Sequence, residues 1–216
     1  MVWDPFGTIG NALWIGGGQW SGKTTVVRIL AQRHDLTAYH VDYQGVHAHY
    51  DRGDARKARA GEPVGDFDAE WAFVTQTPEE MASDVLRNFT VAFAWALDDL
   101  RALVSPHSII ADGWALRPEL VAEIGAADRM VVMVPTEEFR QHQLHTLERA
   151  RQFSHQVSDP ERGQRNRIER DRLVCQEAVD SADRLGIAVV EVDGSRDAEA
   201  IADVVAEHFQ LATVDV

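Results

Sequence analysis

The stretch Gly17-Gly18-Gln19-Trp20-Ser21-Gly22-Lys23-Thr24 fits the phosphate-binding pattern GxxxxGK[ST]. An apolar run of strand type, 12–15, comes directly before it, and a helical stretch, 25–32, comes directly after it. Strand, loop and helix in this order are the context in which the pattern is specific. The sequence therefore predicts a P-loop that holds a nucleoside triphosphate.

Each residue type in this loop has a chemical reason. Glycines let backbone N–H groups turn toward a β-phosphate, and the start of the following helix points the positive end of its dipole at the same place. Lys23 adds a cation, and the hydroxyl of Thr24 is a ligand for Mg²⁺. Trp20 either stacks on a ligand or covers the loop. The predicted nucleotide-binding residues here are Gly17, Gly18, Gln19, Trp20, Ser21, Gly22, Lys23, Thr24 and Thr25.

Length and composition set the background. The 216 residues suffice for one α/β core, so we expect a single domain over 1–216. A formal net charge of −14 argues against nucleic acid or an anionic membrane as the main partner. No apolar run approaches the ~20 residues of a membrane span, and we expect a cytoplasmic protein. The lone Cys175 excludes an internal disulfide and is interpreted as a structural thiol.

Further strands are expected at 36–42, 108–113, 129–134 and 187–192, with helices between them. Such alternation predicts an α/β fold in three layers, a five-stranded parallel sheet between helices. Asp42 and Asp112 each close one of these strands, and the P-loop follows another. All three should therefore lie at the carboxyl edge of the sheet, where ligands bind.

The region 43–106 is predicted to be an insertion on the acceptor side. Its first part, 43–65, is polar and glycine-punctuated and contains four basic residues, which indicates a mobile or ligand-facing segment. Thr77 and Glu80 form a capping-box pattern around Pro78, so a long helix should begin there. Its apolar residues recur every four positions and are interpreted as core.

These features together resemble the P-loop small-molecule kinases, the superfamily of nucleoside monophosphate kinases, shikimate and gluconate kinases and chloramphenicol phosphotransferase. The resemblance covers about residues 12–210 and rests on the P-loop, Asp42, Asp112-Gly113, an arginine-rich segment after the fourth strand, and Val192-Asp193-Gly194-Ser195-Arg196 after the fifth. It implies the strand order 2-3-1-4-5, a helical lid over about 149–167, and ATP with Mg²⁺ as cofactors.

The resemblance also implies roles for the two acids. Asp42 would act as a general base or orienting acceptor for a substrate hydroxyl, and Asp112 would bind Mg²⁺ together with Thr24 or would face the acceptor. A plain structural role, as a cap or turn residue, stays open for both.

The lid would bring arginine forks to the transferring phosphoryl group. Residues 140–172 carry eight arginines against five acids, and most of them should be solvated helix face. Arg149, Arg151 and Arg165 are the predicted catalytic arginines because they flank the probable loop. Gly194, Ser195 and Arg196 resemble the loop that holds adenine. Arg117 weakly resembles the phosphate-binding arginine of adenylate kinases, although the proline of that pattern is displaced.

The leading hypothesis is an ATP-dependent kinase that phosphorylates a hydroxyl of a small metabolite or natural product. One alternative is a nucleoside monophosphate kinase, in which Arg117 and the basic cluster at Arg52, Arg56, Lys57 and Arg59 hold a nucleotide's phosphate. Another is a non-catalytic ATP-binding switch, which would tolerate the loss of Asp42. The aromatic residues around 71–73 and 89–95 leave room for a homodimer face.

Overall fold

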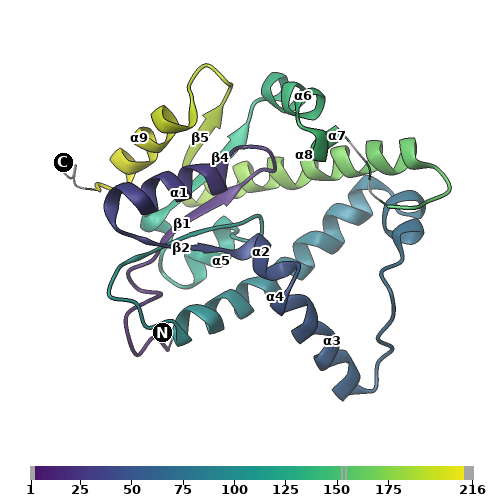
Figure 1. Ribbon diagram of the computed structural model, residues 1–216, viewed down its shortest axis with the longest axis horizontal. Coiled ribbons are helices and arrows are strands. Elements are labelled where there is room, and N and C mark those ends of the chain that lie inside the picture. Colours follow the sequence, from purple (N-terminus) through teal and green to yellow (C-terminus); the bar gives the residue numbers. More distant parts are fainter. Residues whose placement is uncertain (1–2, 152, 154, 212–216) are drawn as a thin grey trace.

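The computed structural model describes residues 3–151, 153 and 155–211, without the side chains of Arg149 and Arg151. Within these residues the strands are β1 (Leu13–Gly17), β2 (Thr37–His40), β3 (Ile109–Asp112), β4 (Met130–Pro135) and β5 (Ala188–Val192). The α-helices are α1 (Lys23–His34), α2 (Val41–Gly45), α3 (Ala48–Ala60), α4 (Pro78–Ala102), α5 (Pro118–Glu123), α6 (Glu137–Thr146), α7 (Glu148–Arg151), α8 (Pro160–Leu185) and α9 (Ala198–His208) (Figure 1). Two short turns complete them: η1 (Trp71–Thr75) is a π-helix and η2 (Ala127–Arg129) a 3₁₀ helix.

The strands form one parallel sheet in the order β2-β3-β1-β4-β5, with β1 at its centre. The chain first runs from β1 to β2 and β3 on one side and then returns past β1 to β4 and β5 on the other. Such a reversal opens a crevice at the carboxyl ends of the central strands. The predicted fold class and strand order are confirmed: the five parallel strands lie between two layers of helices, which gives three α/β/α layers.

Successive residues of each strand point to opposite faces, so each face of the sheet has its own core. Trp14 belongs to the cluster under α4, α5 and α8, and Ile15 belongs to the cluster under α1 and α9. The long helix α4 begins with the predicted capping box, in which Thr77 accepts from the Glu80 N–H and Glu80 accepts from the Thr77 N–H. Its apolar stripe is buried, as predicted.

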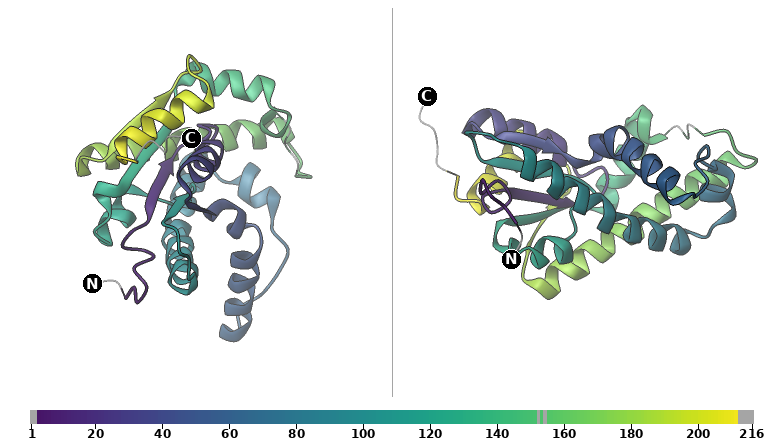
Figure 2. Two further views of the ribbon diagram at one scale, coloured as in Figure 1. Left: turned by 60° about the vertical axis from the view of Figure 1, so that its left-hand side comes forward. Right: turned by 90° about the horizontal axis from the view of Figure 1, so that it is seen from below.

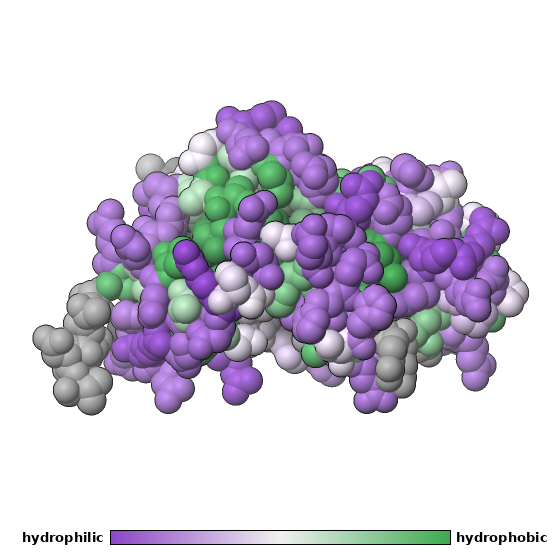
Figure 3. Space-filling model, turned by 90° about the horizontal axis from the view of Figure 1, so that it is seen from above, coloured by the Kyte–Doolittle hydropathy of each residue, from purple (hydrophilic) through white to green (hydrophobic). Residues whose placement is uncertain are grey.

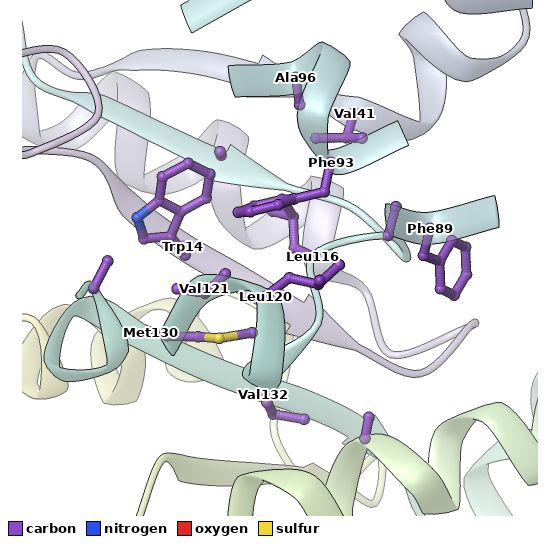
Figure 4. Close-up of a cluster of buried hydrophobic side chains, with 14 of the residues drawn as sticks. Trp14, Val41, Phe89, Phe93, Ala96, Leu116, Leu120, Val121, Met130 and Val132 are labelled. Atoms are coloured by element: carbon purple, nitrogen blue, oxygen red, sulfur yellow. The ribbon is translucent and has the colours of Figure 1, made fainter. Parts of the chain in front are cut away.

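The first of these cores supports the strand that carries the P-loop. Figure 4 shows Trp14, Phe93, Leu116 and Met130 converging between the sheet and its covering helices. The rings of Trp14 and Phe93 lie 6.0 Å apart, and Trp14 is fully buried. Burying one such side chain stabilises the fold by about 1.5–3 kcal/mol. The strand that leads into the P-loop is therefore anchored in this core.

Four element boundaries differ from the sequence predictions. The second strand ends at His40, where its partner β3 also ends at Asp112, so the chain beyond has no strand to pair with and coils into α2. The helix α3 occupies much of the segment expected to be irregular. The helix α8 begins at Pro160, six residues early, because Asp159 caps it by accepting from the Arg162 N–H. The expected single helix through 153 is broken at Leu147, which is extended and separates α6 from α7.

The helix α3 stands off the body of the molecule, and an irregular stretch leads from its end to η1 (Figure 2). Figure 3 shows one face of the surface, on which hydrophilic side chains predominate. Among the described helices, none is both long and apolar enough to cross a membrane.

Candidate active site

The P-loop joins β1 to α1 and is packed tightly against its neighbours. The Gly18 N–H donates a 2.9 Å hydrogen bond to the Met133 carbonyl oxygen of β4. Each of three consecutive glycines also leaves no room for a side chain. A Cβ atom would approach to 2.1 Å of the Leu116 carbonyl oxygen at Gly16, 2.2 Å of the Met133 carbonyl oxygen at Gly17, and 2.6 Å of the Cys175 Sγ atom at Gly18. These glycines therefore let the loop lie close enough to β4, to α8 and to the turn after β3 for its position to be fixed.

The other end of the loop leaves amides ready for an anion. Gly22 has a positive φ of 81° and forms the N-cap of α1, with no side chain capping the helix. The first N–H groups of α1 are thus not satisfied by a cap, which is the arrangement that binds phosphate. Trp20 also has a positive φ, 66°, which is rare for a bulky residue.

Lys23 is folded back over the loop. Its Nζ atom donates a 2.6 Å hydrogen bond to the Gly18 carbonyl oxygen, which also accepts from the Ser21 hydroxyl at 2.9 Å. Burial lowers the pKa of Lys23, and the negative charges of Asp42 and Asp112 oppose that shift. A bound polyphosphate would offer this buried cation a stronger partner than a carbonyl oxygen does.

Thr24 and Asp112 meet beside Lys23. The Thr24 hydroxyl donates a 2.7 Å hydrogen bond to Oδ2 of Asp112. The other oxygen, Oδ1, contacts Nδ1 of His40. A hydroxyl and a carboxylate at this point are hard oxygen ligands of the kind Mg²⁺ prefers. The two residues predicted for the metal are thus brought together, and His40 joins them without having been predicted.

Asp42 lies in the first turn of α2, two residues beyond the end of β2, which corrects its predicted place at a strand end. Its Oδ1 atom accepts a 2.8 Å hydrogen bond from the Trp114 N–H. Gly113 permits this approach, since a Cβ there would lie 2.7 Å from Cβ of Val41 and 3.2 Å from Oδ1 of Asp42. The carboxylate therefore caps the turn after β3 and not its own helix.

The pKa of Asp42 is raised, chiefly because the surrounding protein excludes water from the carboxylate, and the charge of Lys23 opposes the shift. By surface area Asp42 is exposed, so solvent weakens this effect. The carboxylate thus stands at an open edge of the site with Lys23 close enough to influence its charge.

The predicted catalytic arginines are placed unevenly. Arg165 lies on the exposed face of α8 and pairs with Glu161 at 3.8 Å, and its contact with phosphate stays a prediction. Arg149 and Arg151 lie in α7, but their side chains are outside the described residues.

Other arginines of the same segment turn inward. Arg140 is buried and influences the Cys175 thiol, whose pKa burial raises. Arg167 donates to the Ala150 carbonyl oxygen at 2.7 Å, and burial lowers its pKa. Arg170 binds the buried Asp171 at 2.6 Å. Because α8 begins earlier than predicted, the expected helix spacing does not distinguish the inward-facing Arg167 and Arg170 from the exposed Arg165.

A cavity of about 290 Å³ adjoins the P-loop on the side of α6, α9 and β5. The predicted adenine-binding residue Arg196 lines it together with Trp20 and Thr25 of the loop. Gly194 packs on the ring of Phe139, and the Ser195 N–H and hydroxyl are held by Asp193 at 2.9 and 2.7 Å. The remaining lining residues are Ser21, Gly22, Val26, Phe139, Gln143, Leu147, Val192, Asp197, Ala198 and Ile201.

Two basic residues considered for a second nucleotide have structural partners. Arg117 is almost fully buried, donates to the Val174 carbonyl oxygen at 3.2 Å and pairs with Glu177, which ties α5 to α8. Arg52 binds Asp99 at 2.9 Å and lies over the ring of Trp95, which ties α3 to α4.

Comparison with known proteins gives structural neighbours only: no family model matches the chain, and no curated protein matches it in sequence. The shikimate kinase from Aquifex aeolicus is 17% identical over 92% of this chain and 96% of its own, with a TM-score of 0.43. The shikimate kinase from Acinetobacter baumannii, solved with shikimate, is 15% identical over 91% of each chain, with a TM-score of 0.47. A gluconokinase from Sinorhizobium meliloti is 13% identical over 93% of this chain and 92% of its own, with a TM-score of 0.42. These neighbours are P-loop small-molecule kinases, as the resemblance implied, and the likeness is one of fold.

Proposed function

We propose that the protein is an ATP-dependent phosphotransferase that moves the γ-phosphoryl group to a hydroxyl of a small metabolite or natural product. The observation that carries this proposal is that Lys23 of the P-loop lies within electrostatic reach of two carboxylates, Asp42 and Asp112. Phosphoryl transfer needs a cation, a metal ligand and a group that orients the hydroxyl. Lys23, Asp112 with Thr24, and Asp42 supply one each.

The nucleotide would bind along the loop and its cavity. Lys23 and the amides of 17–25 other than that of Gly18, which binds Met133, would hold the phosphates, and the cavity lined by Trp20 and Arg196 would take the base. Thr24 and Asp112 would hold Mg²⁺, which supplies charge neutralisation on the phosphate oxygens. Both residues offer oxygen ligands, the kind that Mg²⁺ prefers.

Asp42 would orient the acceptor. Its Oδ1 atom is fixed by the Trp114 N–H, while Oδ2 accepts no hydrogen bond from the described residues. That free oxygen could accept the hydrogen bond of a substrate hydroxyl and take its proton during transfer. The segment 43–106 would shape the acceptor's pocket, and 149–167 would close over the phosphates as a lid.

The alternatives receive less support. A nucleoside monophosphate kinase would use Arg117 and the cluster Arg52, Arg56, Lys57 and Arg59. Two of these five residues, Arg117 and Arg52, are engaged in holding helices together. A non-catalytic switch gives no reason for a carboxylate near the P-loop whose Oδ1 is fixed by the Trp114 N–H while Oδ2 accepts no hydrogen bond from the described residues. An oriented carboxylate with an available oxygen favours an enzyme.

The test is to incubate the protein and a metabolite extract with ATP labelled with ¹⁸O in its γ-phosphoryl group, and to search by mass spectrometry for small molecules that acquire the heavy phosphoryl. We expect at least one such product with the wild type and none with Lys23→Met or Asp42→Asn. A labelled product that forms equally with Asp42→Asn would remove Asp42 from the mechanism. Transfer only to nucleoside monophosphates would establish the first alternative, and binding of ATP without transfer to any acceptor would favour the second.

A further inference from the structure

The carboxylate of Asp112 is held from two sides. It is almost completely buried, at 1% exposure, and each of its oxygens has one partner. Thr24 donates to Oδ2 at 2.7 Å, and Nδ1 of His40 contacts Oδ1. A buried carboxylate with an unpaired oxygen would be costly, so these two contacts matter for its position.

The contact between His40 and Asp112 follows from the register of the sheet. His40 and Asp112 are paired residues of the neighbouring parallel strands β2 and β3, and each is the last residue of its strand. Neighbouring strands lie ~4.8 Å apart, which brings paired side chains within hydrogen-bonding reach. The His40 ring is further fixed by Tyr43, whose ring centre lies 5.7 Å away.

The direction of the hydrogen bond is set by the chemistry of its partners. An ionised carboxylate only accepts hydrogen bonds, so Nδ1 of His40 must carry the hydrogen. Thr24 in turn donates to the opposite oxygen. The three side chains therefore form a chain of contacts, with Asp112 in the middle and a donor at each end.

We propose that His40 is a positioning residue that orients Asp112 toward Thr24 and the metal ion of a bound Mg²⁺·nucleotide. This inference rests on the metal assignment within the proposed function and extends it by one residue. Outer-shell partners that orient a metal-binding carboxylate typically contribute 10- to 100-fold to metal affinity. The contact of His40 is with the carboxylate, so it should affect metal-dependent binding of the nucleotide much more than metal-free binding.

The test compares side chains that keep or remove the donor. His40→Asn places an amide Nδ2 near the position of Nδ1, whereas His40→Leu and His40→Ala have no donor. His107→Leu is the matched control, because His107 also pairs with an aspartate, Asp35, through Nδ1 at 3.0 Å. His107 lies two residues before β3, at the end of that strand opposite Asp112. Asp112→Asn reports the effect of changing the carboxylate itself.

The measurements are the affinity for ADP with and without Mg²⁺, by calorimetry, and the binding of Mn²⁺ to the ADP complex, by electron paramagnetic resonance. In His40→Leu and His40→Ala we expect Mn²⁺ affinity, and the gain in ADP affinity that Mg²⁺ provides, to fall by about tenfold or more. Metal-free ADP affinity should stay within about twofold. His40→Asn should retain most of the gain, and His107→Leu all of it.

Two results would overturn the inference. One is an unchanged Mg²⁺-dependent gain in both donor-free variants; the other is an equal loss of metal-free ADP binding, which would assign His40 to the loop or the fold. A wild type whose ADP binding ignores Mg²⁺ would overturn the metal assignment as well. These binding measurements use no acceptor. Failure to find a substrate would therefore contradict the proposed transfer reaction without affecting this inference.

Discussion

Gly18 of the P-loop lies directly against Cys175 of α8, so closely that a Cβ atom on the glycine would be 2.6 Å from the cysteine Sγ atom. The helix that carries the arginine-rich segment thus forms part of the wall behind the phosphate-binding loop. The thiol is buried, in agreement with its interpretation as a structural residue. The loop and α8 are in direct contact at this point.

This contact predicts a compensating pair of substitutions. Gly18→Ala should destabilise the protein by about 1–3 kcal/mol through overpacking and weaken ADP binding. Adding Cys175→Ala removes the Sγ atom, so part of both losses should be recovered, with a coupling of about 0.5–3 kcal/mol between the two sites. Thermal unfolding and ADP calorimetry on the two single variants and the double variant measure it.

Gly17→Ala is the control for that cycle. Its Cβ atom would overlap the backbone of Met133 at 2.2 Å, and its φ is 114°, so no side-chain truncation can relieve it. Cys175→Ala should leave the Gly17→Ala defect unchanged. Recovery of Gly17→Ala as well, or additive losses in the Gly18 pair, would show that the thiol contact is not what excludes a side chain.

The hydrogen bond from Thr24 to Asp112 predicts that a variant without the hydroxyl and a variant that keeps it will differ in nucleotide affinity and stability. Thr24→Val keeps the shape but leaves Oδ2 of Asp112 without its donor, so it should lose about tenfold or more in Mg²⁺-dependent nucleotide affinity and about 1–3 kcal/mol in stability. Thr24→Ser should retain most of both. Equal behaviour of the valine and serine variants in calorimetry and thermal unfolding would contradict the role of the hydroxyl.

The raised pKa of Asp42 predicts that removing its charge raises stability, although the same change should abolish activity. Its pKa is raised in the folded protein above the ordinary value of 3.8, so the folded state binds the proton more tightly than the unfolded state does. Stability therefore falls as pH rises from 3.8 through the raised pKa, and the loss persists at higher pH. Asp42→Asn should abolish transfer while unfolding at a higher temperature than the wild type at pH 7.

That stability gain has a pH signature. It should shrink as pH falls through the raised pKa and vanish below about pH 3.8, where both states of the wild type hold the proton. Thermal unfolding of both proteins across this range is the measurement. A less stable Asp42→Asn at pH 7 would show that its contact with Trp114 outweighs the cost of the charge.

The position of Trp20 at the cavity predicts a change in tryptophan fluorescence when ADP binds. Its indole lines the cavity beside the loop, so bound ADP should change the tryptophan emission through contact with the base. Trp20→Phe should lose most of this change. Trp71→Phe, an exposed tryptophan on η1, should keep it, and a signal that survives in Trp20→Phe but not in Trp71→Phe would place the base elsewhere.

The fold could be read from the sequence because its determinants are local. The P-loop pattern, the apolar strands and the capping box at Thr77 each act over a few residues, and all point to the same architecture. The helix α3 was missed because its sequence is polar. It is held by long-range contacts, with His49 and Arg52 bound to Asp99 at 2.7 and 2.9 Å.

The site is less predictable from the sequence than the fold, because several of its contacts join residues far apart in the chain. Thr24 and Asp112 could be predicted together, because Thr24 ends the P-loop pattern and Asp112 ends an apolar strand, and both positions are typical of Mg²⁺ ligands. His40 was not, since its partner depends on strand register, although a histidine two residues before Asp42 was a usable signal. The choice among the arginines depended on where α8 begins, which a single cap at Asp159 sets.

Calorimetry with Mg²⁺·ATP measures whether the P-loop, with Lys23, holds the phosphates of a nucleotide. We expect one nucleotide per chain, with a Kd below about 1 mM, and a loss of at least about tenfold in Lys23→Met with its fold retained. Folded wild-type protein that takes up neither Mg²⁺·ATP nor Mg²⁺·GTP, or a Lys23→Met variant that binds as tightly as the wild type, would contradict it.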